Sequence, residues 1–298
     1  MNNNYSPLVS VLMTSYNREE FIAEAIESVL SSTYKNFELI IVDDCSTDNT
    51  VQIAKQFEEK DERVTVYVNE INLGQFPNRN KASEYARGEY IFYVDSDDKI
   101  LSNGINLLVE TMLQHPQSSF GMQCKKFENV VEFGPVEAIR THFFEFPLLL
   151  HGPGATIMKR DFFNKIGKYP TEFGVPGDMY FNLKATCYSP ITLIPFDFLF
   201  YRVHPGQEKN NPFDYLYNNY KYLNAAFANL PLGLEKEELI WLDKKNKRRF
   251  SVNIIKFFFS TRDVKKTSYA LKEAKFSFKD FITGISYFKE KPAGPKKR

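Results

Sequence analysis

Hydrophobic and polar positions alternate with two different periods along the first hundred residues. Four short runs rich in β-branched and aromatic residues predict buried strands, at 8–14, 37–43, 63–69 and 89–95. Four longer segments repeat apolar residues at the spacing of a helical face or carry helix-start signals, at 18–30, 48–60, 77–87 and 103–115. Strands alternating with helices in this way predict a mostly parallel sheet covered on both faces.

Local signals predict where two of these helices begin and end. Asn17, followed three residues later by Glu20, is typical of the N-terminal capping box of a helix. Pro77 suits the first turn of the third helix, and Gly88 is expected to end it.

The regular alternation stops at about residue 116. Strands or irregular segments are predicted over 119–134 and 141–150, short helices over 160–167 and 178–187, and one further strand over 191–203. From residue 211 onward the pattern becomes helical, with candidates at 234–259 and 279–288. We therefore expect a central α/β domain over 1–210, with halves at 1–115 and 116–210, and a helical C-terminal region over 211–298.

Polar residues follow each of the four predicted strands of the first half. In open α/β sheets, ligands bind beyond the carboxyl ends of the strands. These ends would place one set of charged side chains along a single cleft, namely Asp43, Asp44, Arg79, Asp95, Asp97 and Asp98. Such a coincidence favours a binding site at that edge of the sheet.

The stretch "FYVDSDD", residues 92–98, has two interpretations. Asp and Ser cap helices and form turns, so the acidic cluster can be local backbone chemistry. Alternatively, the carboxylates hold a divalent cation, which prefers hard oxygen ligands and offsets their repulsion. The polar ends of the other three strands favour the second interpretation.

Composition narrows the protein class. The chain has 298 residues, and its three widely spaced cysteines suggest neither a disulfide framework nor a zinc site. The N-terminus has no basic segment before its apolar run, and no run of 18 apolar residues occurs, so neither a signal peptide nor a membrane span is indicated. The expected location is the cytoplasm.

Charge is distributed unevenly along the chain. Residues 244–298 contain 17 Lys and Arg against 4 Asp and Glu, although the whole chain has a net charge of only +1. One interpretation is a solvated basic face on helices that pack against the main domain, and the other is peripheral attachment to anionic lipid. No nucleic-acid recognition motif accompanies the basic residues, so a nucleic-acid partner is not expected.

The first strand is not followed by a glycine-rich phosphate loop. Neither GxGxxG nor GxxxxGK[ST] occurs there, so a nucleotide would need a metal to offset its diphosphate charge. Asp44 would accept a hydrogen bond from a ring N–H such as uracil N3, and Arg79 would lie near the base or phosphates. The alternative for Arg79 is a solvent-facing position on its helix.

Four segments together resemble the inverting family 2 glycosyltransferases of the GT-A fold, which use nucleotide-diphosphate sugars. They are "VSVLMTSYNREEFIAEAIESVL", "FELIIVDDCSTDNT", "NLGQFPNRN" and "YVDSDD". The resemblance covers residues 8–115, weakens over 150–205 and disappears after about 210. It implies that 1–115 binds the nucleotide sugar and that 116–210 binds the acceptor.

The resemblance also implies roles for residues at the strand ends. Its Asp-x-Asp segment corresponds to Asp95, which would meet the ribose, and Asp97, which would hold Mn²⁺ or Mg²⁺. The positions of Tyr16 and Asp44 are those that contact the base. Thr14 and Asp43 adjoin these positions, and Arg79 matches the arginine of the third segment. Cys45 stands where glycine is usual, which affects only the turn.

Two further segments carry catalytic and metal-binding expectations. "PGDMYFNLKA" resembles the family's Glu-Asp motif, whose aspartate is the general base, and this implies that role for Asp178. Gly177 replaces the preceding acid, and Asp178 has a helix N-cap as its alternative role. "YRVHPGQE" implies that His204 reaches the metal or diphosphate. In "HGPGATIMKRDFF", Gly152 and Gly154 would let a sugar approach.

The resemblance implies metal-dependent, inverting transfer from a nucleotide sugar to a hydroxyl group. The expected donor is a UDP-sugar, and the expected acceptor is a glycan or lipid-linked molecule in surface polysaccharide synthesis. A sugar nucleotidyltransferase is disfavoured because "TSYNREEF" lacks its glycine-rich loop. A noncatalytic nucleotide- or glycan-binding protein stays open, and displacement of Asp178 from the cleft would favour it.

Overall fold

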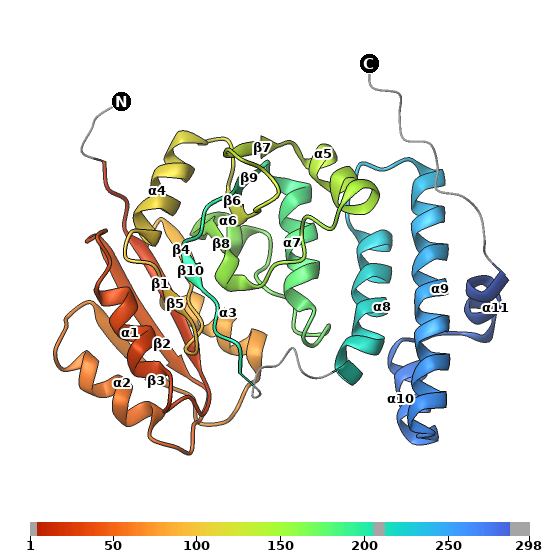
Figure 1. The fold of residues 1–298 in the computed structure, drawn as a ribbon, viewed down its shortest axis with the longest axis horizontal. Helices are drawn as coiled ribbons and strands as arrows, with labels where there is room; N and C mark the ends of the chain where they lie inside the picture. Colours follow the sequence, from red (N-terminus) through yellow and green to blue (C-terminus); the bar gives the residue numbers. More distant parts are fainter. Residues whose placement is uncertain (1–4, 205–211, 287–298) are drawn as a thin grey trace.

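The central sheet has the predicted mostly parallel arrangement. The computed structural model describes residues 5–204 and 212–286, in which eight strands follow the order β3-β2-β1-β4-β8-β6-β9-β7. The four predicted strands of the first half are present and mutually parallel, as β1 (Val9–Ser15), β2 (Phe37–Asp43), β3 (Val64–Val68) and β4 (Tyr90–Tyr93). Figure 1 shows this sheet with helices packed around it.

Helices cover both faces of the sheet because alternate strand residues point to opposite sides. The helices of the first half are α1 (Ile22–Leu30), α2 (Thr50–Glu58), α3 (Gln75–Tyr85) and α4 (Gly104–Gln114). Val11 and Met13 of β1 are fully buried in one core with α1, α2 and α4. Leu12 between them is buried in the other core with Phe76 of α3.

The predicted capping box at Asn17 and Glu20 is wrong. Helix α1 begins at Ile22 with Phe21 in the N-cap position, and no side chain caps it. Asn17 instead adopts a left-handed conformation (φ 51°), and its Oδ1 accepts a hydrogen bond from the Thr47 backbone N–H at 2.9 Å. The segment after β1 is thus bonded to the segment after β2, which holds the two strand ends together.

The second half adds four strands to the sheet. They are β6 (Phe120–Gln123), β7 (Val131–Phe133), β8 (Thr156–Lys159) and β9 (Ile191–Ile194). Strand β8 runs antiparallel to both β4 and β6, and it joins the two halves into one sheet.

The single strand predicted over 191–203 is two strands. Strand β9 ends before Pro195, which has no N–H to donate to a sheet. The chain then forms β10 (Leu199–Phe200), which pairs with β5 (Lys99–Ile100) in a separate two-stranded sheet. This pairing brings residues 201–204 beside the acidic segment that follows β4.

Short helices fill the remainder of the second half. They are α5 (Pro135–Arg140), α6 (Arg160–Lys165), α7 (Gly177–Tyr188) and the single 3-10 turn η2 (Pro153–Ala155). The segment 141–150, predicted as strand or irregular, begins with a π-helical turn, η1 (Thr141–Glu145), that continues α5.

The C-terminal region is helical as predicted. It contains α8 (Pro212–Asn229), α9 (Lys236–Thr261), α10 (Val264–Glu273) and α11 (Phe278–Ser286). These helices lie at the end of the molecule away from α1 and α2 (Figure 1), and they enclose a third core around Tyr220 and Phe250. Among residues 5–204 and 212–286, no helix combines the length and apolarity needed to cross a bilayer.

Candidate functional site

A cavity of ≈ 610 Å³ lies at the carboxyl ends of β1, β2 and β4, and we call it the strand-end cavity. Most of the predicted site residues line it: Thr14, Tyr16, Asp44, Arg79, Asp95, Asp97 and Asp178. These residues come from both halves of the domain, as the sequence interpretation requires. Asp178 in particular is not displaced from the cleft, which favours an enzyme over a binding protein.

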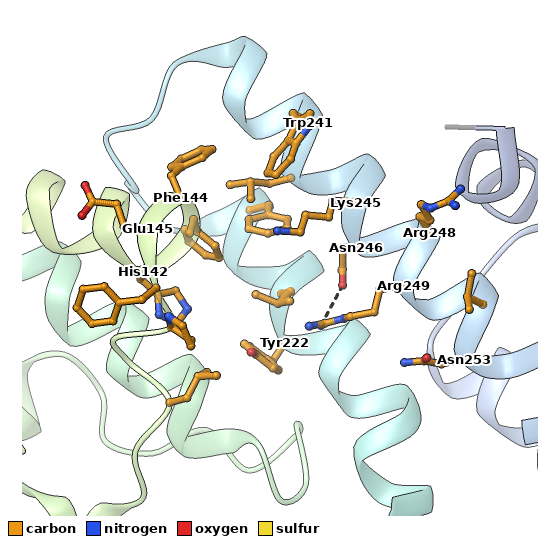
Figure 2. A pocket seen from close by; sticks show the side chains of 18 residues that line it. His142, Phe144, Glu145, Tyr222, Trp241, Lys245, Asn246, Arg248, Arg249 and Asn253 are labelled. Atoms are coloured by element: carbon orange, nitrogen blue, oxygen red, sulfur yellow. Dashed lines mark hydrogen bonds between the residues drawn. The ribbon is translucent and has the colours of Figure 1, made fainter. Parts of the chain in front are cut away.

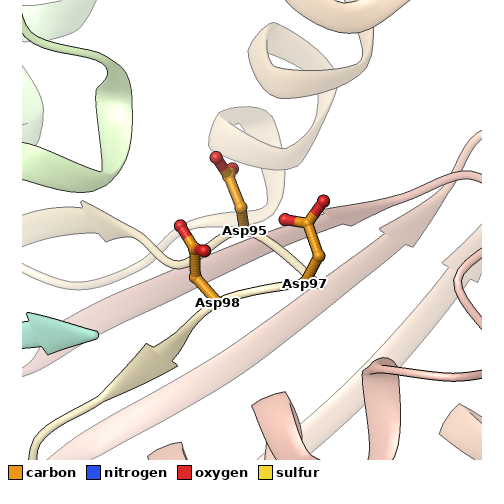
Figure 3. Close-up of side chains that lie close together, drawn as sticks. All are labelled: Asp95, Asp97 and Asp98. Atoms are coloured by element: carbon orange, nitrogen blue, oxygen red, sulfur yellow. The ribbon is translucent and has the colours of Figure 1, made fainter. Parts of the chain in front are cut away.

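Three carboxylates converge on one side of this cavity. One oxygen from each of Asp95, Asp97 and Asp98 lies within 4.8 Å of the others. Figure 3 shows the three side chains grouped after β4. Burial raises the pKa of Asp98 to about 7, and the neighbouring charges of Asp95 and Asp97 add to this effect. A divalent cation would offset this repulsion, so the donor set fits a hard metal ion.

His204 completes this cluster from a distant part of the chain. Its Nε2 lies 2.9 Å from Asp97 Oδ2, and its ring packs on Phe21 with centroids 4.7 Å apart. The adjacent Arg202 donates its backbone N–H to Asp98 Oδ1 at 2.9 Å and its Nε–H to the Asp97 carbonyl at 3.0 Å. The β5–β10 pairing therefore positions His204 as a further candidate ligand.

Arg79 is a buried cation with two unused donor groups. Its Nη2 donates to Asp95 Oδ1 at 2.6 Å, while Nε and Nη1 have no hydrogen-bond partner among the described residues. Burial alone would lower the pKa of Arg79, but the Asp95 carboxylate outweighs it and raises the pKa. Arg79 is only 4% exposed, so an anionic ligand in the cavity would satisfy donors that water does not reach.

Asp44 and Asp43 differ in what they can still bind. Asp44 Oδ1 accepts hydrogen bonds from the Leu73 N–H and from Asn69 Nδ2, at 2.8 Å each. Within residues 5–204 and 212–286, Oδ2 accepts only from the Gly74 N–H, also at 2.8 Å. Oδ2 thus retains one acceptor position toward the cavity ligand. Asp43 does not line the cavity.

Asp43 has a local structural role in this arrangement. It is fully buried, and its carboxylate accepts hydrogen bonds from the Ser15 hydroxyl and from the N–H and hydroxyl of Ser46. These contacts connect the ends of β1 and β2, so Asp43 supports the cavity wall rather than contacting its contents.

Asp178 lies in the first turn of α7 and lines the same cavity as the carboxylate cluster. Burial raises the pKa of Asp178 to about 7, against the opposing effects of the Met179 N–H and the charge of Arg79. A carboxylate with a pKa near neutrality is suited to general-base chemistry. Its Oδ1 accepts a hydrogen bond from the Met179 N–H at 2.7 Å. Its Oδ2 accepts none from residues 5–204 and 212–286, which leaves this oxygen for an acceptor hydroxyl.

Two glycines lie beside Asp178, and close packing explains the first of them, Gly177. A Cβ on Gly177 would lie 2.7 Å from Phe76 Cε2 and 3.1 Å from the Pro170 carbonyl oxygen. The acidic side chain that the resemblance leads one to expect at 177 has no room. At Gly152, a Cβ would reach within 3.8 Å of Asp178 Oδ2, so its absence leaves space beside the proposed base.

Sequence reasoning missed several residues of the strand-end cavity. Arg18 lines it, and its Nε lies 3.2 Å from Asp97 Oδ2. The position of Arg18, four residues after the end of the strand predicted at 8–14, was an available signal. Gln123, His151 and Tyr201 also line the cavity, but they come from segments whose local pattern does not indicate a strand end.

Comparison with known proteins identifies the family. The model of "Glycosyl transferase family 2" matches residues 10–175, which is more than half of the chain. The chain belongs to glycosyl transferase family 2. The match includes the acidic cluster and most of the strand-end cavity, and it stops just before Asp178.

Curated relatives are similar to a little more than a third of the chain. TuaG of Bacillus subtilis strain 168, named as a glycosyltransferase of teichuronic acid biosynthesis, is 44% identical over 37% of this chain and 44% of its own length. The Escherichia coli UDP-Glc:α-D-GlcNAc-diphosphoundecaprenol β-1,3-glucosyltransferase WfgD is 42% identical over 36% of this chain and 42% of its own length. The matched segment spans less than half of each relative.

Solved structures resemble the chain over almost its whole length. S. aureus TarS 1–349 with UDP-GlcNAc has a TM-score of 0.71 at 21% identity, covering 93% of this chain and 81% of TarS. The Pyrobaculum calidifontis mannosyltransferase PcManGT, with GDP-Man and Mn²⁺, has a TM-score of 0.64 at 16% identity, covering 95% and 84%. This likeness confirms the GT-A fold predicted from the sequence.

Cys45 of this family 2 member, which stands where the resemblance leads one to expect glycine, has an unusual backbone conformation. Cys45 adopts φ 68°, a left-handed conformation that glycine enters without the steric cost of a Cβ. Its Sγ lies 3.7 Å from the Glu70 carbonyl oxygen. The resemblance predicts that the cysteine affects only the turn, and Cys45 occupies that turn in a conformation that favours glycine.

Proposed function

We propose that this protein is a metal-dependent, inverting glycosyltransferase that uses a UDP-sugar. One observation carries the proposal: a single cavity joins the Asp95, Asp97 and Asp98 cluster to Asp178, whose pKa is raised to about 7. Residues 1–115 would bind the donor, 116–210 would bind the acceptor, and 211–298 would form the basic helical region.

The metal would be held by Asp97 and His204. Their side chains already approach within 2.9 Å of each other. Burial, together with the negative charges of Asp95 and Asp97, raises the pKa of the neighbouring Asp98. Mn²⁺ accepts both carboxylate and imidazole ligands, whereas Mg²⁺ prefers oxygen alone. When bound, the ion would supply Lewis-acid stabilisation of the departing diphosphate.

The chain's own residues would orient the donor. Asp44 Oδ2 would accept from uracil N3–H, with Tyr16 and Thr14 beside the base, and Asp95 would meet the ribose. Arg79 would direct its unpaired Nε–H and Nη1–H groups at donor oxygens. Arg18, beside Asp97, would add a second positive charge near the diphosphate.

Asp178 would act as the general base. It would take the proton from an acceptor hydroxyl as that oxygen forms a bond to the anomeric carbon and the bond to the diphosphate breaks. The single displacement inverts the anomeric configuration, and the electron pair of the broken bond leaves with the nucleoside diphosphate. General-base assistance of this kind contributes about 10²- to 10⁴-fold.

We place the reaction in surface polysaccharide synthesis, on a glycan or lipid-linked acceptor. The relatives TuaG and WfgD, whose names concern teichuronic acid and a diphosphoundecaprenol acceptor, support this class. The enzyme would work at the cytoplasmic face of a membrane.

The C-terminal helices would make the membrane contact through residues 244–298, of which the structure describes those up to 286. Apolar side chains of α9 and α11 are exposed there, with Phe259 at 72%, Phe278 at 78% and Ile282 at 50%. Exposed aromatic residues beside many Lys and Arg suit anionic lipid.

Calorimetric titration of UDP and GDP, with and without Mn²⁺, tests the donor site. Manganese-dependent binding of UDP to the wild type is expected, and UDP-sugars would then be screened for transfer. Absence of nucleotide binding under every condition would overturn the proposal and leave the noncatalytic alternative. Co-sedimentation with anionic vesicles, unchanged when 244–298 is deleted, would remove the membrane contact.

A further inference from the structure

A second cavity lies outside the strand-end cavity, and we call it the α9 groove. It measures ≈ 740 Å³ and lies between η1, the loop that follows it, α8 and α9. One wall is aromatic, with Phe143, Phe144 and Phe146 from the η1 segment and Phe227 from α8. Figure 2 shows these elements on either side of the groove.

The opposite wall is one stripe of α9 that combines an aromatic ring with two cations. Trp241, Lys245 and Arg249 follow at four-residue spacing, which places them on one face over about 12 Å of helix. Lys245 Nζ lies 4.8 Å from the centre of the Trp241 ring, and Trp241 stacks near Phe144 with centroids 5.9 Å apart. Lys245 and Arg249 extend from α9 toward the groove (Figure 2).

The groove has a net positive interior. Arg249 Nη2 donates a hydrogen bond to Asn246 Oδ1 at 3.4 Å, and no carboxylate forms an ion pair with Arg249 within residues 5–204 and 212–286. Burial lowers the pKa of His142 to about 4, so this wall residue is neutral, and its Nδ1 accepts from the Leu149 N–H. Glu145 points away from α9 in Figure 2.

The groove adjoins the strand-end cavity. Leu150 lines both cavities. Tyr222, a buried wall residue of the groove, is close enough to Arg249 and Asp178 for both charges to act on its hydroxyl, whose pKa burial raises to about 12. A molecule with its hydroxyl at Asp178 could therefore extend past Leu150 toward Arg249.

We propose that the α9 groove binds the diphosphate and first isoprene units of an isoprenoid-diphosphate-linked acceptor. The inference rests on the proposed function, because it assigns the acceptor of the same reaction. Lys245 and Arg249 would bind the diphosphate, and the aromatic rings of the η1 segment, α8 and Trp241 would pack against the isoprenoid chain. The acceptor sugar would reach Asp178.

The chemistry of the groove favours this occupant over the other acceptor classes. A neutral glycan would stack on the aromatic rings but would offer no anion to Arg249, with which no carboxylate pairs within residues 5–204 and 212–286. A free phosphate would pair with the cations but leave the aromatic walls exposed to water. Only a ligand with an anionic head and an apolar chain matches both walls at once.

The chain's single tryptophan makes the test direct. Trp241 is the only tryptophan in the sequence, so its fluorescence reports on this groove alone. Farnesyl diphosphate is titrated into the full chain without metal ion, so that the strand-end cavity does not attract the diphosphate. We expect a saturable change in emission, with farnesol and inorganic diphosphate each binding at least about tenfold more weakly.

Substitution of one cation provides the matched comparison. Arg249→Gln should weaken farnesyl diphosphate binding by about tenfold or more, because a charge-assisted contact is lost. Lys256→Gln removes the same charge from an exposed position on α9 outside the groove, and it should bind like the wild type. Equal binding by Arg249→Gln and the wild type would overturn the proposal. Farnesol or inorganic diphosphate binding as tightly as farnesyl diphosphate would overturn it too.

Failure of this inference can be separated from failure of the proposed function. Manganese-dependent UDP binding is measured calorimetrically on the same preparations. UDP binding without farnesyl diphosphate binding would exclude the groove as acceptor site and keep the donor chemistry. Binding of farnesyl diphosphate without binding of UDP would exclude the donor chemistry and keep the groove as a binding site. The protein would then be an isoprenoid-diphosphate-binding protein.

Discussion

The strand-end cavity and the α9 groove adjoin each other but are built in opposite ways. The cavity is lined largely by polar side chains placed within a few residues of a strand end, as Asp44, Asp95 and Asp97 are. The groove joins side chains about one hundred residues apart, such as Phe144 and Trp241. The first arrangement follows from the geometry of a parallel sheet, and the second follows only from tertiary packing.

The two regions also carry opposite charge. Carboxylates gather at the strand ends, where Asp98 already has a raised pKa, while Lys245 and Arg249 lie in the groove. A cation is the expected complement of the first region and an anion that of the second. The comparison therefore predicts that the two regions can be damaged separately.

The largest effect is expected from Asp178 in the strand-end cavity. Asp178→Asn should reduce turnover by about 10²- to 10⁴-fold, because the amide cannot accept the acceptor proton. Binding of UDP and of farnesyl diphosphate should both persist. Asp161→Asn, at an aspartate whose side chain is 91% exposed, is the control and should retain full turnover. Near-normal turnover by Asp178→Asn would exclude the general-base role.

Substitution of Asp97 should damage the strand-end cavity alone. Asp97→Asn should weaken manganese-dependent UDP binding by at least about tenfold, since loss of even a supporting residue of a metal ligand costs that much. Calorimetry with and without Mn²⁺ checks this. Full metal-dependent binding by the variant would refute the assignment of Asp97, and a parallel loss of farnesyl diphosphate binding would break the separation of the two regions.

The pH dependence of catalysis should report on Asp178. Its carboxyl must be deprotonated to accept a proton, and burial raises its pKa to about 7. Below about pH 7, kcat/KM should therefore fall by about tenfold per pH unit, and above it the rate should level off. UDP binding is measured over the same range. A rate that stays flat down to about pH 5, while UDP binding is also unchanged, would contradict the role of Asp178.

The glycine before Asp178 should be essential for packing rather than chemistry. Gly177→Ala would place a Cβ 2.7 Å from Phe76, and such overpacking typically costs about 1–3 kcal/mol of unfolding free energy. Gly134→Ala is the matched control, because its Cβ would meet no atom within 4 Å. Chemical denaturation of the two variants measures the difference. Equal stability would show that α7 shifts to make room.

The same contrast explains what could be predicted from the sequence. The alternating hydrophobic periods were sufficient to predict strands β1 to β4. They also predicted that Asp44, Asp95 and Asp97 lie together, since strand ends in a parallel sheet meet at one edge. Asn17 and Glu20 were misinterpreted because their local pattern matches a capping box. Tertiary hydrogen bonds between the two strand-end loops override that pattern.

Long-range features had no comparable signal. Pro195 divides a strand whose composition is continuous, and the resulting β5–β10 pair is what brings His204 to Asp97. The α9 stripe is visible as a helical spacing of Trp241, Lys245 and Arg249. Nothing in that spacing indicates that the aromatic η1 segment lies opposite.

The smallest predicted effect concerns the turn after β2. Cys45→Gly should raise the unfolding free energy by about 1 kcal/mol or less, because glycine removes the steric cost of φ 68° but adds chain entropy to the unfolded state. Denaturation midpoints measure the change. Cys45→Ala, which keeps a Cβ in the same turn, is the control and should not be stabilised.

UDP binding should be unchanged in Cys45→Gly, since Asp44 forms its hydrogen bonds with Asn69, Leu73 and Gly74 rather than with the thiol. Weaker UDP binding in a more stable protein would mean that the strained turn itself positions Asp44, and the strand-end cavity would then depend on more than strand geometry.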